Sequence, residues 1–530
     1  METEFEGDVL IQINIIEQLM KDNCFESVEI YSNILFTHPK LSYDKKCEFG
    51  LYLGICFFKK GEFKHSLYYL NNSFMITDAH NIDDKKAKHN AEVIYYKVQN
   101  IYQLEENKNN FEMLMKCIRN LEEIPLQYRL YKHNYLLSTY YIRTYHPEKA
   151  KEYCLTALRQ QPYSLECLSQ LSSLGIDPKE VYKIYASLNI DISKSPLLNK
   201  LIPAIIQENT NSSYSLTLYK DLLSIYPSNA YIVSCISKMY LYICLYKQAY
   251  LWYQRALKLD RYLLRNMCVY IECVQILKNK EAIKTIKDVA EDIEQISRAN
   301  FMLYLSLFYY YYPIDKVQAM NYLSLCSDIS PAHLSIYKGR EMIAIEEGNK
   351  DLYKQLCWDM IKLYPNLYSY KCLVDAHLMT GDIQEALYIS KSLYDSRYIY
   401  KGEKDHQEEI AECIYILGRT LSKCKNGRDQ ARKQLEKCLV INSHNEEAIM
   451  TLVNIYIEDK QIEKARDLLL NILPCHPSTA LKNILIRILI NQKDIENALY
   501  QLQTSLTEIN ENDENQQDKN INTSDDDLFT

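Results

Sequence analysis

Apolar residues recur at the spacing of an α-helix along most of the chain, and the clearest example is segment 248–262 (QAYLWYQRALKLDRY). One face of this predicted helix carries Ala249, Tyr253, Ala256 and Leu257. Leucine at the two alanine positions would bury more apolar area. The small–aromatic–small order therefore raises the question of which neighbour requires small side chains on this face.

A second helix is predicted directly upstream, in the stretch IVSCISKMYLYICLY. Its apolar face carries Val233, Ile236, Ser237 and Tyr240. The spacing of the two helices matches the tetratricopeptide pattern W-x2-L-G-x2-Y, followed by A-x3-F-x2-A and a proline. In the 34-residue numbering of that repeat, positions 20, 24 and 27 are Ala249, Tyr253 and Ala256.

The same positions recur in register along nearly the whole chain. Positions 8, 11, 20, 24, 27 and 32 are filled in turn by Ser138, Tyr141, Ala150, Cys154, Ala157 and Pro162; by Leu307, Tyr310, Ala319, Leu323, Cys326 and Pro331; and by Val453, Tyr456, Ala465, Leu469, Ile472 and Pro477. Further fits are Leu53–Gly54 with Phe57 and Gly61, and Gly348 with Pro365. Weaker copies lie at 27–39, 111–125, 215–227, 386–393, 418–439 and 498–505.

This register predicts an all-α fold, a right-handed superhelical tetratricopeptide-repeat solenoid of roughly thirteen helix-turn-helix repeats. Small residues at positions 8 and 20 let the two helices of a repeat approach closely, and position 27 does the same against the next repeat. Aromatic residues at positions 11 and 24 fill the remaining space. The alternative, a run of unrelated amphipathic helices, does not account for six positions in register.

The predicted array divides into four parts. Residues 1–162 are N-terminal repeats, 163–195 a degenerate half-repeat with a connection, 196–507 C-terminal repeats, and 508–530 an acidic disordered tail. A second loop is expected at Asp395–Gln407 (DSRYIYKGEKDHQ). Each interruption is either a kink in the superhelix or an ordinary surface insertion.

The tail TEINENDENQQDKNINTSDDDLFT carries eight acidic residues and one lysine from Glu508 onward, with few apolar residues. Such a segment buries too little apolar surface to offset the entropy of ordering it. It is either a solvating tail or an attractor for a basic partner. Thr523 and Ser524 precede three aspartates, which resembles an acidophilic kinase site.

Composition narrows the functional class. With 11 Gly and 13 Pro in 530 residues, the chain has little material for hairpins or glycine-rich phosphate loops. A net charge of −8 argues against nucleic-acid binding. The 17 cysteines include no CxxC, the acidic start METEFEGDVL is unlike a secretory leader, and the longest apolar runs are too short for a bilayer. We therefore expect a soluble intracellular protein with reduced cysteines and no membrane partner.

No motif points to catalysis or to a cofactor. The chain contains no GxxxxGK[ST], GxGxxG, GxSxG or HExxH. Cys268 and Cys273 lie five residues apart with no histidine at ligand spacing, and are more typical of core thiols than of a metal site. We therefore expect a protein that is not an enzyme and that holds no metal and no cofactor.

A solenoid of this kind offers surface in place of a catalytic cleft. In each repeat, positions 5, 9 and 12 of the first helix point towards the concave groove. The candidates for a peptide-binding groove are Lys238, Tyr304, Phe308, Arg419 and Asn454. A basic side chain beside aromatic rings holds a peptide carboxylate or acidic residue while the rings take its apolar parts. The alternative is that these residues form a solvated concave face.

Three segments carry a more specific resemblance. They are WYQRALKLDRYLLRNMCVYIECV, with the block Met267–Tyr270; LRQQPYSLECLSQLSSLGIDPKEV, at Leu158–Val181; and FESVEIYSNILFTHP near the start. Together with the acidic tail, they resemble the subunit 7 family of the tetratricopeptide subunits of the anaphase-promoting complex, or cyclosome. The resemblance extends over essentially the full chain, although the repeat positions account for much of it.

The resemblance implies a role as well as a fold. Members of that family are non-catalytic scaffold subunits of a nuclear and cytoplasmic ubiquitin ligase of cell division. They form homodimers through their N-terminal repeats and stack on sister tetratricopeptide subunits, and relatives bind coactivator tails. Alternative functions are another cyclosome subunit, a peptide-binding adaptor such as a co-chaperone, or a scaffold of a transport complex. The adaptor is disfavoured because basic residues do not cluster at groove positions of adjacent repeats.

Overall fold

The computed structural model describes residues 2–76, 83–105, 110–277, 282–296, 300–398, 406–443, 445–474, 478–492, 494 and 497–499. Every regular element within these residues is a helix. The predicted all-α class is therefore confirmed. The predicted acidic tail, residues 508–530, lies outside the described residues.

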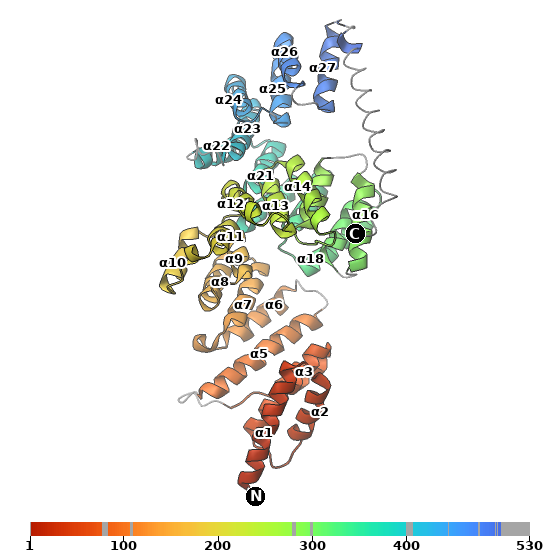
Figure 1. The fold of residues 1–530 in the computed structure, drawn as a ribbon. Helices are drawn as coiled ribbons and strands as arrows, with labels where there is room; N and C mark the ends of the chain where they lie inside the picture. Colours follow the sequence, from red (N-terminus) through yellow and green to blue (C-terminus); the bar gives the residue numbers. More distant parts are fainter. Residues whose placement is uncertain are drawn as a thin grey trace, which may run out of the picture. The chain divides into compact units, whose positions relative to one another are not determined.

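The helices follow one another with short connections, and neighbours in sequence lie side by side (Figure 1). From the N-terminus to residue 206 they are α1 (Glu2–Lys21), α2 (Phe25–Phe36), α3 (Tyr43–Lys60), α4 (Phe63–Asn71), α5 (Asp84–Leu104), α6 (Phe111–Glu122), η1 (Leu126–Tyr128), α7 (Tyr131–Arg143), α8 (Pro147–Gln160), α9 (Leu165–Ser173), α10 (Pro178–Ser187), η2 (Ile192–Lys194) and α11 (Pro196–Ile206).

The later helices are arranged in the same way. They are α12 (Ser212–Ile225), α13 (Ala230–Tyr242), α14 (Tyr246–Leu259), α15 (Met267–Ile276), α16 (Ala282–Ile296), α17 (Phe301–Tyr311), α18 (Lys316–Ile329), α19 (Leu334–Glu346), α20 (Lys350–Leu363), α21 (Leu367–Thr380), α22 (Ile383–Tyr398), α23 (Gln407–Ser422), α24 (Arg428–Ile441), α25 (Glu446–Glu458), α26 (Ile462–Ile472) and α27 (Thr479–Asn491).

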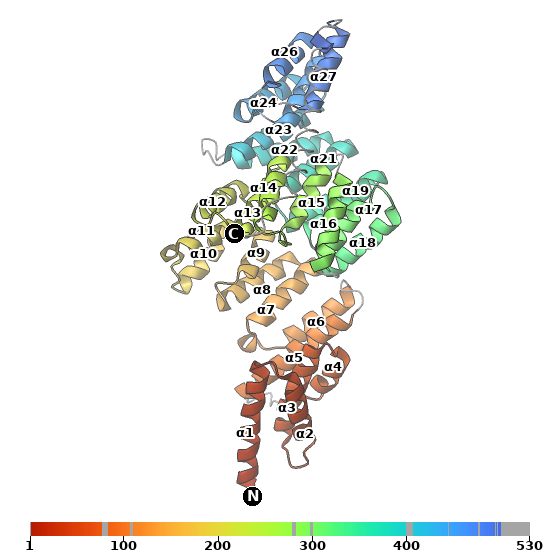
Figure 2. The same cartoon turned by 45° about the vertical axis from the view of Figure 1, so that its right-hand side comes forward.

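The chain forms two compact units. The N-terminal unit comprises the described residues up to Leu241, Leu245–Glu347 and Asp359–Pro365. The C-terminal unit comprises Tyr242–Cys244, Gly348–Trp358 and the described residues from Asn366 onward. Each unit is built from helix pairs, such as α17 with α18 and α23 with α24 (Figure 2).

Close helix pairing explains the small–aromatic–small pattern. Ala249, Tyr253 and Ala256 on α14 are all fully buried. The hydroxyl of Ser237, at position 8, donates to the backbone carbonyl of Ala249, at position 20, over 2.6 Å. Because a larger residue at either position would separate the two backbones, this hydrogen bond requires small side chains.

The same hydrogen bond recurs in another repeat. The hydroxyl of Ser138 on α7 donates to the carbonyl of Ala150 on α8 over 2.9 Å. Where position 8 is glycine, a neighbouring side chain fills the space, because a Cβ on Gly54 would lie 2.5 Å from the Leu70 side chain. Serine and glycine at position 8 are therefore both small enough for close helix packing, and serine adds a buried hydrogen bond.

Helix ends follow from local chemistry. The side chain of Asn366 accepts a hydrogen bond of 3.0 Å from the backbone N–H of Ser369 and caps the start of α21. Gly381 ends the same helix with a φ of +87°, a left-handed conformation that glycine adopts without a Cβ clash. These two residues set the length of α21, whose inner face carries part of the site described below.

The chain is partly helical at both expected interruptions. Within 163–195 the chain forms two short helices, α9 and α10, and the 3-10 turn η2. The predicted loop Asp395–Gln407 begins as helix, because α22 continues to Tyr398. Most of that loop, residues 399–405, lies outside the described residues.

Candidate functional site

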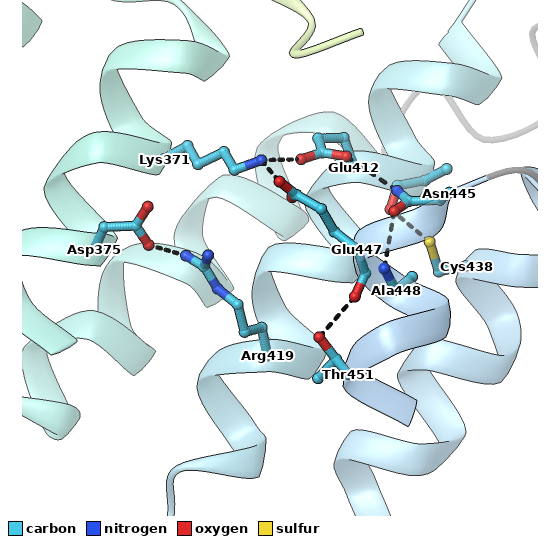
Figure 3. A network of polar contacts seen from close by, with 10 residues as sticks. Lys371, Asp375, Glu412, Arg419, Cys438, Asn445, Glu447, Ala448 and Thr451 are labelled. Carbon is cyan, nitrogen blue, oxygen red and sulfur yellow. Dashed lines mark hydrogen bonds and ion pairs between the residues drawn. The ribbon is translucent and has the colours of Figure 1, made fainter. Parts of the chain in front are cut away.

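We call the first helix of each repeat an inner helix. In the C-terminal unit, a network of charged side chains joins the inner helices α21, α23 and α25 of three successive repeats. Lys371 on α21 donates to Glu412 on α23 and to Glu447 on α25, each over 2.8 Å (Figure 3). Lys371 and Glu412 are buried, with side chains 8% and 5% exposed, whereas Glu447 is 51% exposed. The network therefore runs from the interior of the unit to its surface.

The carboxylate of Glu412 has a second partner. The side-chain amide of Asn445, at the start of α25, donates to it over 3.1 Å. The backbone N–H of Ala448 donates to the side-chain oxygen of the same asparagine over 3.0 Å. Asn445 thus links the cap of α25 to the charge buried on α23.

A second ion pair lies one helical turn further along. The guanidinium of Arg419 on α23 donates to Asp375 on α21 (Figure 3). The ring centre of Tyr415 lies 5.4 Å from Lys371 Nζ and 5.5 Å from Arg419 Cζ. Both cations therefore face the π-electrons of one ring as well as a carboxylate.

Burial and pairing shift the two glutamates in opposite directions. Burial raises the pKa of Glu412 above its ordinary value, although the ammonium of Lys371 opposes this effect. Burial also acts to raise the pKa of Glu447, but the attraction and hydrogen bond of Lys371, together with Arg419 and Tyr415, outweigh it and hold that pKa below its ordinary value. Glu447 is therefore ionised at neutral pH.

The N-terminal unit has an analogous buried pair. Lys338 on α19 donates to Glu272 on α15 over 3.0 Å, and the two side chains are only 7% and 2% exposed. The hydroxyl of Ser335 donates to the other oxygen of Glu272. Burial lowers the pKa of the nearby His333 to about 4, with Glu272 acting in the opposite direction.

Chain segments far apart in sequence meet inside the N-terminal unit. The guanidinium of Arg143, at the end of α7, donates to the backbone carbonyl of Ile329 over 3.3 Å, across 186 residues. Gly175 lies against Pro365, where an added Cβ would be 3.0 Å from the proline ring. We call these two contacts the return contact. Because both span more than five 34-residue repeats, the unit winds back on itself.

The structure places the five predicted groove residues in different environments. Lys238 pairs with Glu208 over 2.7 Å, and Arg419 pairs with Asp375. Tyr304 is half-buried and stacks on Tyr322 with ring centres 6.3 Å apart. Asn454 is exposed.

Phe308 requires a correction. It is fully buried in the hydrophobic core formed by α14 to α19, so it presents no surface to a peptide. The apolar run FMLYLSLFYYYY contains large side chains on every helical face. In such a helix the repeat numbering does not separate the core face from the groove face.

Sequence reasoning missed the buried charges at Glu272, Lys338, Lys371 and Glu412. Three of them share their helices with further charged residues. Glu272 is the single charged residue of an apolar helix, MCVYIECVQI on α15. A charge in such a setting is rarely buried without a partner. At Glu272 the isolated charge was an available signal, but the partners of these residues lie one or two repeats away and are not visible locally.

Asn454 belongs to a surface pocket near the end of the described chain. The pocket has a volume of about 240 Å³, and we call it the distal pocket. Its lining comes from α25, α26 and α27 and includes Asn454, Ile457, Ile462, Ile484, Arg487 and Ile488. It combines an apolar wall with one basic side chain.

The part of the chain that the structure describes contains neither a cluster of metal ligands nor a membrane-spanning helix. No group of three or more His, Cys, Asp or Glu side chains there is arranged to hold a metal ion. None of the helices in that part is both long enough and apolar enough to cross a membrane.

Comparison with known proteins agrees with the repeat geometry. The family model described as Tetratricopeptide repeat matches residues 428–488, which span α24 to α27. A crystal structure of the APC/C hetero-tetramer Cut9–Hcn1 superposes with a TM-score of 0.52 at 14% identity, over 92% of this chain and 98% of that chain. The chain is a tetratricopeptide-repeat solenoid.

Two curated relatives carry the same name. The chain is 22% identical over 506 residues to anaphase-promoting complex subunit 7 of Dictyostelium discoideum, covering 87% of this chain and 81% of the relative. It is 20% identical over 358 residues to anaphase-promoting complex subunit 7 of Arabidopsis thaliana, covering 66% of this chain and 62% of the relative. The similarity to subunit 7 that the sequence suggested is therefore confirmed by two separate relatives.

Proposed function

We propose that this solenoid is a non-catalytic scaffold subunit of an anaphase-promoting complex, the ubiquitin ligase of cell division, acting in the nucleus and cytoplasm. The observation that carries the proposal is the similarity to subunit 7 proteins along 87% of the chain. A match of this extent includes both structural units, so it concerns the whole array and not a single repeat.

The geometry of the inner helices supports a scaffold over a peptide adaptor. Two of the predicted groove cations, Lys238 and Arg419, are already paired with carboxylates of this chain. A cation used in this way is a poor receptor for an external acidic peptide, because the internal pair must first be broken. Of the five candidates, Asn454 is the one that we propose to face a ligand.

Affinity purification tests the proposal directly. The tagged chain, expressed in its own cells, should co-purify with a cullin–RING pair and with sister tetratricopeptide subunits. A scaffold role predicts that these partners remain bound at moderate salt, since large subunit interfaces are mainly apolar. Recovery of the chain without any cullin or RING protein would reject the assignment.

The proposal includes a homodimer formed through the N-terminal repeats. On α1, Ile11 and Ile15 are exposed by 59% and 44%; on α2, Ile30 and Ile34 are exposed by 59% and 63%. Residues four apart lie on the same face of a helix, so each helix presents a pair of solvent-exposed isoleucines. A second copy of the chain would bury this apolar surface.

Light scattering of the purified chain tests the dimer. The wild type is expected to have twice the mass of one chain, and the double variant Ile11→Glu/Ile15→Glu is expected to be monomeric. Val440→Glu is the matched control, because Val440 on α24 is 87% exposed but lies in the C-terminal unit. A wild type that stays monomeric at high concentration would contradict the dimer without affecting the scaffold assignment.

A further inference from the structure

The distal pocket exposes part of its apolar wall. Two of its wall residues, Ile457 and Ile462, are 39% and 36% exposed. Its volume of about 240 Å³ is several times the ~30 Å³ that a water molecule occupies in the liquid. An apolar wall of this kind favours an apolar occupant over water.

The charge at the pocket is also distinctive. Arg487 on α27 is exposed, and within the described part of the chain the structure gives it no ion-pair partner. Three basic side chains on α19, α21 and α23 differ, since Lys338, Lys371 and Arg419 each pair with a carboxylate. Arg487 therefore adds a site for an acidic group at the edge of an apolar pocket.

The chain itself supplies a segment with the complementary chemistry. Its last residues, DDDLFT, place three aspartates, Asp525–Asp527, directly before Leu528 and Phe529. The described chain reaches Leu499, and twenty-five residues then separate Leu499 from Asp525. A coil of that length spans roughly 25–30 Å on average, which is enough to return to α27.

We propose that Asp525–Phe529 docks in the distal pocket of its own chain. Leu528 and Phe529 contact the isoleucine wall, and the aspartates lie beside Arg487. The short connection favours this occupant, because tethering gives the tail an effective concentration in the millimolar range at the pocket. A weak contact is therefore sufficient for occupancy, and an external ligand must displace the tail. This inference goes beyond the scaffold role and does not depend on it.

A labelled peptide tests the proposal on the full chain. The probe is residues 519–530 (KNINTSDDDLFT) with an N-terminal fluorophore, and binding is followed by fluorescence anisotropy. In the variant Leu528→Ser/Phe529→Ser, the chain's own tail should release the pocket. The peptide should therefore bind this tail variant at least tenfold more tightly than it binds the wild type.

Two further substitutions on the tail-variant background locate the site. Arg487→Glu should weaken peptide binding at least tenfold, whereas Lys437→Glu, at an exposed position on α24, should leave it unchanged. A peptide with Asp525–Asp527 replaced by lysines should bind the Arg487→Glu chain better than the native peptide does. This charge reversal excludes misfolding as the cause of lost binding.

Three outcomes would overturn the inference. The peptide could fail to bind the tail variant, or Arg487→Glu could leave binding unaffected. The third outcome is equal affinity for wild type and tail variant, which would mean that the pocket is open to ligands in trans and is not occupied by the tail. None of these outcomes bears on co-purification with a cullin–RING pair, so failure of the scaffold proposal stays distinguishable.

Discussion

The two units differ in how far the charged residues of their inner helices are buried. In the N-terminal unit, Lys338 and Glu272 are both sealed from solvent, and the chain closes on itself at the return contact. In the C-terminal unit, the network starts at buried Lys371 and ends at half-exposed Glu447. One repeat pattern therefore builds either a closed interior or an open inner surface, depending on the partners of a few inward charges.

The largest effect is expected from breaking the sealed pair. Lys338→Met leaves Glu272 buried without its cation, which should cost about 3–5 kcal/mol of unfolding free energy. Urea unfolding, with hydrogen exchange of α15 and α19 as the local readout, measures this loss. The double variant Lys338→Met/Glu272→Gln should recover most of the stability. The control Lys437→Met, at an exposed position on α24, should have no effect. A loss below 1 kcal/mol for the single variant would contradict a sealed pair.

Acid should lower the folding stability of the N-terminal unit through His333. Its pKa is lowered to about 4, so the folded state binds its proton less readily than the unfolded state does. This residue therefore contributes full stability above about pH 6.5, and the contribution is lost as pH falls towards 4, by about 3 kcal/mol in total.

The variant His333→Asn isolates that contribution. Asparagine keeps a side-chain acceptor for the backbone N–H of Ser335, which His333 now caps, but it does not titrate. The stability difference between wild type and variant should therefore change between pH 6.5 and 4 in chemical denaturation. A constant difference across this range would show that the pKa of His333 is the same in the folded and unfolded states.

A smaller effect tests the return contact. Gly175 and Gly381 both have positive φ, +66° and +87°, but an added Cβ meets Pro365 only at Gly175. Gly381→Ala should cost about 1 kcal/mol for its backbone alone. Gly175→Ala should cost about 2 kcal/mol, because the methyl also presses on the proline. Equal losses in thermal unfolding would mean that the return contact is loose.

The smallest effect is expected at the second ion pair of the C-terminal unit, Asp375–Arg419. Asp375→Asn removes the partner of Arg419, but both side chains are partly solvated, at 33% and 21% exposure. Pairs of this kind contribute about 1 kcal/mol or less. The loss should shrink further at 1 M salt, where charges are screened within about 3 Å. A salt-independent loss in urea unfolding would indicate that the pair is as sealed as that of Lys338.

The sequence predicts the repeats well because their information is local. Ser237 and Ala249 are twelve residues apart, and the hydrogen bond that joins them follows from the repeat numbering. Phe308 was misplaced because its helix is apolar on every face, so periodicity gives no orientation. The pair Lys371–Glu412 and the contact of Arg143 with Ile329 join residues 41 and 186 positions apart. Such partners depend on how the repeats wind, which no local pattern specifies.

The contact between Arg143 and Ile329 also limits how this array can evolve. Repeat proteins commonly gain or lose whole repeats, since each repeat contacts only its neighbours. Here a duplication or deletion between α7 and α18 would shift the far side of the winding out of phase with Arg143 and would separate Gly175 from Pro365. The return contact therefore requires a fixed number of repeats in this stretch, and length variation among relatives should fall outside it.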